Sequence, residues 1–284
     1  MQPSFRTPAG LAEPADVAAL QAFLQSSRRL FVLTGAGCST ESGIPDYRDH
    51  SGAWKRSPPV DYASFVGQAP VRQRYWARSL VGWRHFRGAV PNPAHQALAQ
   101  LEAAGRLIGL VTQNVDGLHQ AAGSQHVIDL HGRIDRVGCL RCQHRFERAH
   151  YQTWLEQHNR AWLPVQAAMA PDGDADLEGV DFSRFVVPNC PRCGGIIKPD
   201  VVFFGEAVPR HRVDQAWSWL AQADAMLVVG SSLMLYSGFR FARAAAERGL
   251  PLAALNQGQT RADALLTLKV QASASQLAQA VAPA

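Results

Sequence analysis

Four of the five cysteines in the 284-residue chain stand in two CxxC pairs, Cys139 with Cys142 and Cys190 with Cys193. Four thiolates are the ligand set of a closed tetrahedral Zn²⁺ site, which keeps no open coordination position for a substrate. A thioredoxin-like redox pair is the alternative, but two pairs, each on a turn containing Gly or Pro, argue against it. The sequence therefore predicts one structural zinc ion. The fifth cysteine, Cys38, is unmatched, and we expect it to pack in the core.

Two glycines, Gly35 and Gly37, follow the apolar run 30–33, which has the length and β-branched content of a buried parallel strand. Glycine allows the backbone to turn sharply and to come close to a ligand. A strand followed by such a turn is how α/β proteins place a pyrophosphate on backbone N–H groups. The usual dinucleotide fingerprint also requires Gly or Ala at position 40, where this chain has Thr40. The turn alone therefore does not indicate a hydride-transfer enzyme.

Polar side chains follow two further apolar runs at the point where each run ends. Asn114 and Asp116 come after 107–111, and His131 comes after 127–130. The carboxyl ends of parallel strands form the edge at which open α/β sheets bind ligands. Asx side chains also hold strand-to-helix turns, and for Asn114 and Asp116 taken alone that interpretation is favoured. A lone histidine is usually a core or surface residue, but a neutral imidazole at this edge can accept a proton, so His131 is a candidate general base.

The motifs around these residues resemble those of the sirtuins, the NAD-dependent protein deacylases. The stretch GAGCSTESGIPDYR, which begins at Gly35, is similar to their cofactor loop GAGxSxxSGIPDFR, with Tyr47 in place of the usual Phe. TQNVDGLH is similar to their TQNxDxLH motif, and LHG at 130–132 to their ELHG-type motif, with Asp129 in place of Glu. The resemblance covers nearly the whole chain, from about residue 20 onward. YWAR, PNPAH, CLRC and KPDVVFFGE look most like the class II branch.

The resemblance implies a role for each matched residue. It implies that His131 is the catalytic base, that Asn114 orders water and the nicotinamide ribose, and that Asp116 binds the nicotinamide carboxamide. Segments 230–232 and 256–258 each follow a predicted strand, and their hydroxyl and amide groups suit phosphate and the adenosine ribose. The expected NAD contacts are Gly35, Ala36, Gly37, Ser39, Thr40, Glu41, Pro45, Asp46, Tyr47, Arg48, Gln113, Asn114, Val115, Asp116, Gly230, Ser231, Ser232, Asn256, Gln257, Gly258 and, through its backbone near the adenine, Ala274.

The stretch KPDVVFFGE resembles the substrate-binding segment of the same family. We expect 201–204 to be extended, because an extended segment can pair with the backbone of an incoming peptide. Val202, Phe203 and Phe204 would then line an apolar tunnel for the stem of an acyl-lysine. The alternative is an ordinary core strand, and Phe203 in particular can be partly that.

Tyr75 and Arg78 stand three residues apart in a segment expected to be helical, which places both on one face. Some sirtuins use a YxxR pair to hold an acidic acyl group, with the arginine bonding its carboxylate bidentately. The alternative, a solvated arginine beside a core tyrosine, is slightly favoured.

The elements that must position these residues alternate between strand and helix. The apolar patterns predict strands at 30–33, 107–111, 127–130, 225–229 and 252–255, and helices at 17–26, 94–104, 213–223 and 237–248. Such alternation predicts an α/β fold with a doubly wound, parallel, Rossmann-like sheet. The pattern stops between the two CxxC pairs. We therefore expect a discontinuous NAD-binding domain, 1–135 and 199–284, interrupted by a small four-cysteine zinc module at 136–198.

The composition of the chain indicates which kinds of partner it can bind and in which compartment it works. The net charge is +5, and no run of Lys and Arg concentrates it, so a nucleic-acid partner is unlikely. A mildly basic surface also suits an anionic cofactor or acidic protein substrates. No apolar stretch approaches the length of a membrane span, so no membrane association is expected, and the N-terminus lacks the apolar region of a signal peptide. CxxC cysteines that hold metal favour a reducing compartment, and we expect the cytoplasm.

The resemblance implies an NAD-dependent protein-lysine deacylase of the deacetylase type. Its partners would be acyl-lysine proteins, its cosubstrate NAD, and its products nicotinamide, free lysine and O-acyl-ADP-ribose, with one structural Zn²⁺. Alternatives are a deacylase specialised for longer or acidic acyl groups and an NAD-dependent protein ADP-ribosyltransferase using the same NAD site. A non-enzymatic sensor of NAD or ADP-ribose is a further alternative, but a pure binder needs no base such as His131. The acyl group, the protein targets and the oligomeric state stay open.

Overall fold

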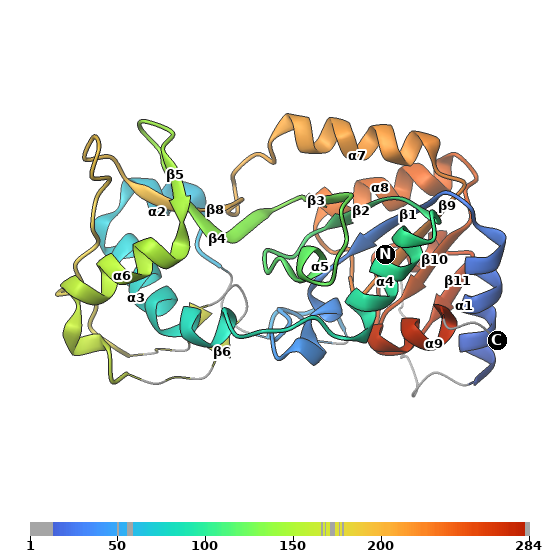
Figure 1. The fold of residues 1–284 in the computed structure, drawn as a ribbon, viewed down its shortest axis with the longest axis horizontal. Coiled ribbons are helices and arrows are strands. Elements are labelled where there is room, and N and C mark those ends of the chain that lie inside the picture. The colour runs from blue at the N-terminus through green and yellow to red at the C-terminus, as the bar shows by residue number, and fades with distance from the viewer. Residues whose placement is uncertain are drawn as a thin grey trace, which may run out of the picture.

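The computed structural model describes residues 14–49, 51–55, 59–165, 167, 169–170, 174–175, 177 and 179–281. The predicted large domain therefore has its ends, 1–13 and 282–284, outside the described residues. Figure 1 shows two units side by side, a larger one built on a parallel sheet and a smaller one that carries the cysteines.

The larger unit is built on a six-stranded sheet in which every neighbouring pair of strands is parallel. Its order is β11 (Leu268–Val270), β10 (Leu252–Leu255), β9 (Ala225–Val229), β1 (Leu30–Thr34), β2 (Leu107–Thr112) and β3 (Val127–Asp129). The chain moves outward from β1 to β3 and later returns to β9 on the other side of β1. The strand order thus reverses between β1 and β9, which is where doubly wound sheets bind ligands. The predicted fold class is confirmed.

Helices cover both faces of this sheet (Figure 1). Leu30 and Val32 of β1 pack into a core with α1 (Pro14–Ser26), α4 (Pro93–Ala103) and α9 (Leu277–Val281). Phe31 and Leu33 point to the opposite face, into a core with α7 (Arg210–Gln222) and α8 (Tyr236–Glu247). Burial on both faces explains why β1, β9 and β10 read as continuous apolar runs. Among the described helices, none combines the length and the apolar composition that crossing a membrane requires.

The smaller unit contains an antiparallel sheet in the order β5 (Arg145–Glu147), β4 (Gly132–Cys139), β8 (Ile197–Val201). It also contains α6 (Arg148–His158) and a two-stranded ladder of β6 (Met169–Ala170) with β7 (Asp174–Ala175). Helices α2 (Tyr62–Gly67) and α3 (Ala69–Phe86) share its core, where the Trp76 and Tyr151 rings lie 4.6 Å apart. The sequence predicts both helices in the large domain, whereas they pack on the cysteine-containing segment.

The predicted strands of the parallel sheet and their helices lie within a few residues of the observed ones, but α6 and the strands β4, β5, β6 and β7 of the smaller unit were not predicted. The strand β11 was not predicted, because three residues with one buried side chain give almost no periodic signal. The extended segment expected at 201–204 also lies differently, since the strand β8 ends at Val201. Its pairing with β4 stops at Gly132 opposite Val201, and among the described residues 202–204 pairs with no strand apart from a bridge between Phe204 and Asp61.

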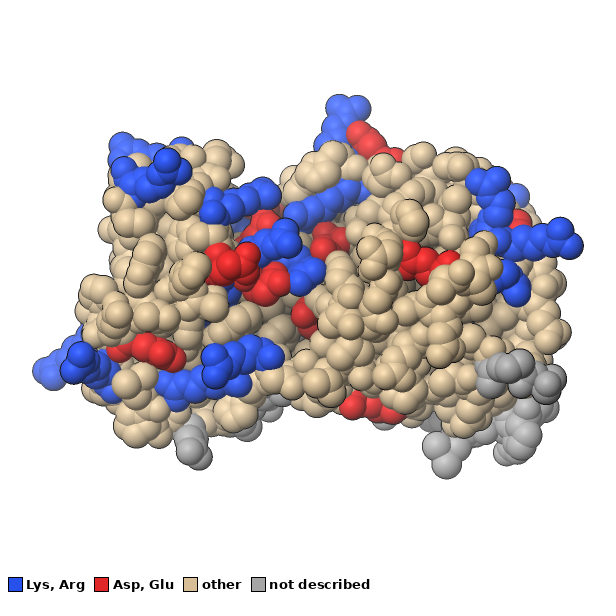
Figure 2. All heavy atoms as spheres, viewed as in Figure 1, with Lys and Arg blue, Asp and Glu red and all other residues tan. Residues whose placement is uncertain are grey.

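The charged side chains are distributed rather than gathered. On the face seen in Figure 2, Lys and Arg form several separate groups over both units, and acidic side chains lie beside most of them. A nucleic-acid site usually shows one basic stripe or patch. This face therefore gives no support to a nucleic-acid partner.

Candidate active site

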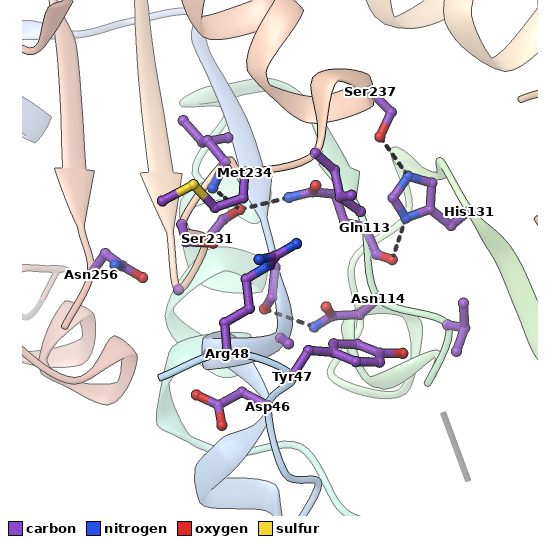
Figure 3. A pocket seen from close by; sticks show the side chains of 18 of the residues that line it. Asp46, Tyr47, Arg48, Gln113, Asn114, His131, Ser231, Met234, Ser237 and Asn256 are labelled. Carbon is purple, nitrogen blue, oxygen red and sulfur yellow. Dashed lines mark hydrogen bonds between the residues drawn. The ribbon is translucent and has the colours of Figure 1, made fainter. Parts of the chain in front are cut away.

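A cavity of about 520 Å³ opens at the carboxyl edge of the sheet, where β1 and β9 lie side by side. This volume is in the range of sites that hold a small organic ligand. The expected site residues that line it are Gly35, Ala36, Gly37, Thr40, Glu41, Asp46, Tyr47, Arg48, Gln113, Asn114, Val115, His131, Val202, Phe203, Phe204, Gly230, Ser231, Ser232, Asn256, Gln257 and Ala274. Figure 3 shows several of them converging from different strands and loops.

Six other expected residues are not among the described residues that line the cavity: Ser39, Pro45, Asp116, Gly258, Tyr75 and Arg78. Conversely, the cavity wall contains residues that sequence reasoning did not single out, among them Trp54, Met234 and Ser237. Ser237 stands at the start of α8, and no motif or spacing marked it as a site residue.

Glycines allow the two turns at the head of the cavity to touch backbone to backbone. The Gly37 N–H donates to the Gly230 carbonyl at 2.8 Å, and the Gly35 N–H donates to the Val229 carbonyl at 3.1 Å. Gly230 has a φ of 59°, and a Cβ there would lie 2.2 Å from the Cys38 nitrogen. Any larger residue at 230 would force the turns apart. Cys38 itself is fully buried beneath the turn, as expected for core packing, and burial raises the pKa of its thiol, so it stays protonated.

A hydrogen-bonded layer lies behind the Gly-rich turn. The Ser39 hydroxyl donates to the Asp116 carboxylate at 2.7 Å and accepts from the Asn114 amide at 3.0 Å. The Asn114 amide also donates to the Gly35 carbonyl at 3.0 Å, and Asp116 accepts from the Leu118 N–H at 2.9 Å. Both Asx side chains therefore hold turns, as the structural interpretation predicted. Asn114 in addition faces the cavity, whereas Asp116 lies behind it.

Two buried histidines, His95 and His119, lie beside the hydrogen-bonded groups behind the glycine turn. The His95 ring is bonded to Asn92 and lies 3.5 Å from the Ser39 hydroxyl, and the His119 ring is 2.9 Å from the Thr34 hydroxyl. Burial lowers the pKa of both imidazoles. Both rings are therefore neutral hydrogen-bonding groups at pH 7, and they fix the turn without adding charge behind it.

His131 presents one basic nitrogen to the cavity. Its Nδ1 lies 3.0 Å from the Gln113 carbonyl, which can only accept, so Nδ1 carries the proton. Nε2 is then the unprotonated nitrogen, and its lone pair accepts a hydrogen bond from the Ser237 hydroxyl at 2.9 Å (Figure 3). Burial lowers the pKa of His131 from 6.5 to about 4, the bond to Gln113 opposes the change, and the charges of Arg240 and Arg212 add to it. His131 is thus a neutral base at pH 7.

The residue after His131 fixes how the chain leaves the sheet edge. Gly132 has a φ of 89°, and a Cβ there would lie 1.9 Å from the Asp200 carbonyl oxygen. The chain can therefore pass from β3 into β4 beside β8 only with glycine at this position. In the motif His131-Gly132, the histidine supplies the base and the glycine is required by the path of the backbone.

The segment after β8 is held in place by an ion pair. The Lys198 ammonium lies 3.0 Å from the Glu206 carboxylate and 4.6 Å from the centre of the Phe203 ring. Glu206 also accepts from the Phe203 N–H at 2.9 Å, and the Val202 N–H donates to the His131 carbonyl at 2.7 Å. The segment 202–204 is therefore fixed beside the candidate base, and in the described part of the chain it pairs with no strand beyond the bridge from Phe204 to Asp61.

The two phenylalanines of this segment have different surroundings. Phe203 is buried, with its ring 5.1 Å from that of Phe65 and 5.3 Å from that of Tyr75. Phe204 is 36% exposed and its ring lies 5.8 Å from that of Trp54. Phe203 is thus largely a core residue that reaches the cavity wall, as the alternative interpretation allowed.

Tyr75 and Arg78 lie on α3, away from the cavity wall. Tyr75 is part of the aromatic core with Phe65 and Phe203. The Arg78 guanidinium pairs bidentately with Asp174, at 3.0 Å through each of Nε and Nη2, and Nε also donates to the Ala175 carbonyl at 2.9 Å. These contacts tie α3 to the strand β7.

The four paired cysteines form one cluster, as predicted, with their sulfur atoms all within 4.8 Å of one another. Cys139 and Cys193 lie 3.5 Å apart, and Cys142 and Cys190 lie 3.7 Å apart. These spacings are too long for a disulfide bond and suit the edges of a tetrahedron around an ion with Zn–S bonds of about 2.3 Å. The donor set and its geometry therefore fit Zn²⁺.

Comparison with known proteins agrees with this arrangement. The model of the Sir2 family matches residues 35–237. An NAD-dependent protein deacetylase of Bordetella bronchiseptica is 65% identical over 256 residues, which are 90% of this chain and 93% of that protein. The mitochondrial NAD-dependent protein lipoamidase sirtuin-4 of Bos taurus is 47% identical over 282 residues, 98% of this chain and 90% of that one. A solved structure of Sir2 with a p53 peptide and NAD⁺ superposes with a TM-score of 0.76 at 32% identity, covering 93% of this chain and 95% of the other.

Proposed function

Because the chain belongs to the Sir2 family, the sirtuins, we propose that it is an NAD-dependent protein-lysine deacylase of the deacetylase type. The observation that carries the proposal is the placement of His131. Its unprotonated Nε2 faces a cavity at the point where the strand order reverses, beside Asn114 and two glycine turns. A sensor of NAD would need the turns but not a buried neutral base aimed into the cavity.

NAD is a cosubstrate in this proposal, and the chain offers a distinct group for each of its parts. The glycine turn 35–37 lines the cavity where the pyrophosphate would lie, and the hydroxyls of Ser231 and Ser232 beside it suit phosphate oxygens. Asn256 and the backbone near Ala274 suit the adenosine end. The segment 39–48 closes over the cavity from one side, and the bond between Glu41 and Ser275, 2.6 Å, ties it to the adenosine end.

The reaction moves an acyl group from lysine to ADP-ribose and releases nicotinamide. Asn114 positions the nicotinamide end, where the glycosidic bond breaks, and Asp116 supports Asn114 from behind the cavity through Ser39. His131 then takes a proton from a ribose hydroxyl through Nε2, and that oxygen attacks the acyl carbon. The outer edge of 202–204 pairs with the substrate backbone, and Phe204 with Val202 lines the path of the lysine stem. The protein's contribution is positioning and the exclusion of water.

Zn²⁺ has a structural place in this proposal. Cys139, Cys142, Cys190 and Cys193 would hold it, and it would join the turn after β4 to the turn before β8. A four-thiolate site leaves the ion no position for a substrate.

We place the chain in the class II branch on its motifs YWAR, PNPAH, CLRC and KPDVVFFGE. We propose that the zinc module spans 136–198 and is completed by α2 and α3, which share its core. The cytoplasm follows as the proposed location from the reduced, metal-holding cysteines.

One experiment tests the proposal directly. Purified protein with NAD and a panel of acyl-lysine peptides, followed by mass spectrometry, should show loss of the acyl group matched by nicotinamide and O-acyl-ADP-ribose. The rival is an ADP-ribosyltransferase, which would transfer label from the adenosine part of NAD onto protein. Transfer of label with no loss of acyl groups would replace our proposal with that one.

The pH dependence of activity should reflect the low pKa of His131. A base loses activity as the pH falls through its pKa, and burial lowers this pKa to about 4 from the ordinary 6.5. We therefore expect kcat/KM for the peptide to stay level between about pH 6 and 8, since kcat/KM reports the free enzyme. An inflection near 6.5 in the pH profile would show that His131 is solvated and titrates normally.

The role of Tyr75 and Arg78 in acyl choice is a proposal that substitution can decide. The pairing of Arg78 with Asp174 leads us to expect that Arg78→Met lowers activity on acetyl-, succinyl- and glutaryl-lysine alike. Losing this partly buried pair should cost roughly 1–2 kcal/mol of stability, or a few degrees in Tm. Asp174→Asn, which breaks the same pair, is the matched variant and should behave the same way. A loss of more than about tenfold confined to the acidic acyl groups would instead establish the YxxR role.

A further inference from the structure

The hydroxyl of Ser237 occupies the lone pair on which the proposed reaction depends. It lies 2.9 Å from Nε2 of His131, and both residues line the same cavity. We infer that Ser237 is a positioning residue for the general base, which donates a hydrogen bond to the neutral imidazole and accepts one from the imidazolium. The inference rests on the proposed function, because it concerns the proton that His131 removes from the ribose.

The fold brings this hydroxyl to the base by a specific route. Ser237 lies in the first turn of α8, which follows the loop after β9. The next residue is Gly238, and a Cβ there would lie 2.7 Å from Oε1 of Gln113. Gln113 is also the residue whose carbonyl accepts from Nδ1 of His131. The small residue at 238 therefore lets α8 approach close enough for the imidazole to be held at both nitrogens, by Gln113 on one side and Ser237 on the other (Figure 3).

The protonated form of His131, the imidazolium, is the form that most needs a hydrogen-bond acceptor. His131 is buried, and the charged groups that bear on it are Arg240 of α8 and Arg212 of α7, both positive. Arg240 lies on the same turn as Ser237, with its Nε donating to the Ser237 carbonyl at 3.1 Å. An arginine side chain has no hydrogen-bond acceptor and is positively charged, so neither one stabilises the protonated ring. A serine hydroxyl can donate and accept, and it is the neutral group that meets both states of the base.

The proton balance of the step is simple. The O–H bond of a ribose hydroxyl breaks, an N–H bond forms at Nε2, and the oxygen uses the freed electron pair to bond the acyl carbon. The π electrons between that carbon and the lysine nitrogen move onto the nitrogen in the same step. The Ser237 hydroxyl rotates from donor to acceptor and gains no net proton. A hydrogen bond to a charged group is stronger than one to a neutral group. Ser237 therefore favours the imidazolium, and losing it should make protonation of His131 about fivefold to tenfold harder.

The test compares two reactions of one enzyme. Exchange of labelled nicotinamide into NAD, in the presence of acyl peptide, reports cleavage of the glycosidic bond, which precedes the action of His131. Deacetylation of the same peptide requires the base. Ser237→Ala should lower deacetylation about fivefold to tenfold, with exchange and the KM for NAD within twofold of wild type. Ser237→Thr keeps the hydroxyl and should restore most of the rate.

Two controls separate positioning from a general structural effect. In a protein that already carries His131→Ala, adding Ser237→Ala should change nothing further, because Ser237 acts through His131. In ¹⁵N-histidine-labelled protein at pH 7, the Nε2 signal of His131 should move toward that of a free lone pair in Ser237→Ala and stay in place in Ser237→Thr. This second measurement needs no catalysis.

Each outcome is decisive. A selective loss of deacetylation, rescue by threonine and a shifted Nε2 signal support the inference. Equal losses in exchange and deacetylation, an unchanged rate in Ser237→Ala, or a full additional loss on the His131→Ala background would overturn it. If the wild-type protein fails to deacetylate any peptide, the proposed function fails, and the Nε2 signal alone then decides whether Ser237 holds the imidazole.

Discussion

His131→Ala is expected to lower the rate of deacetylation by about 10²–10⁴, the usual contribution of a general base. The reason is geometric: Nε2 is the unprotonated nitrogen, it faces the cavity, and the bond from Nδ1 to the Gln113 carbonyl fixes it in that state. NAD affinity should change by no more than a few fold, since the turns around Gly35, Gly37 and Gly230 are untouched. Steady-state kinetics on an acetyl-lysine peptide and calorimetric binding of NAD measure the two quantities.

A second histidine provides the matched control. His126 lies after β2 on the surface, with its side chain 69% exposed, and it pairs with Glu102 away from the cavity. His126→Ala should leave deacetylation and NAD affinity unchanged. If His131→Ala retains more than half of the wild-type kcat, His131 is not the general base. A variant with little deacetylation but intact nicotinamide exchange would support that role.

The parallel sheet was predictable because its strands are buried on both faces. Such strands read as short apolar runs, and β9 and β10 begin and end at the residues that the sequence predicts. The turns after β1 and β9 were also predictable, because Gly35, Gly37 and Gly230 follow these apolar runs directly in the sequence. Local sequence determines these features directly.

Other features depend on contacts between distant segments, which no local pattern encodes. The helix α3 was expected in the large domain, but it packs on α6 through Trp76 and Tyr151 and belongs to the core of the smaller unit. The partner of Arg78, Asp174, stands 96 residues away in the chain. Ser237 reaches His131 across 106 residues, and only the approach of α8 to β2 at Gly238 brings them together. Spacing rules work within an element and cannot reveal such pairs.

The largest effect on the folded structure is expected from loss of the metal. The buried cysteines Cys139 and Cys190 belong to the core that α3 and α6 share, so the metal that joins them would hold this core together. Structural Zn²⁺ contributes about 10–16 kcal/mol of apparent binding free energy in zinc-finger peptides, which is free energy of folding. Cys142→Ala, or a strong chelator, should therefore unfold the smaller unit, measured as rapid proteolysis between β4 and β8.

Activity should fall with the metal even though the ion does no chemistry. The strands β4 and β8 connect the zinc module to the site. β4 begins right after His131, and β8 ends at Val201, just before the substrate segment. Loss of their pairing at Gly132 and Val201 would release both. Freshly purified protein should contain one Zn²⁺ per chain by elemental analysis, and Cys38→Ala, the matched control, should keep it because Cys38 lies outside the cluster. Fully active protein with clearly less than one metal ion per chain would contradict this structural role.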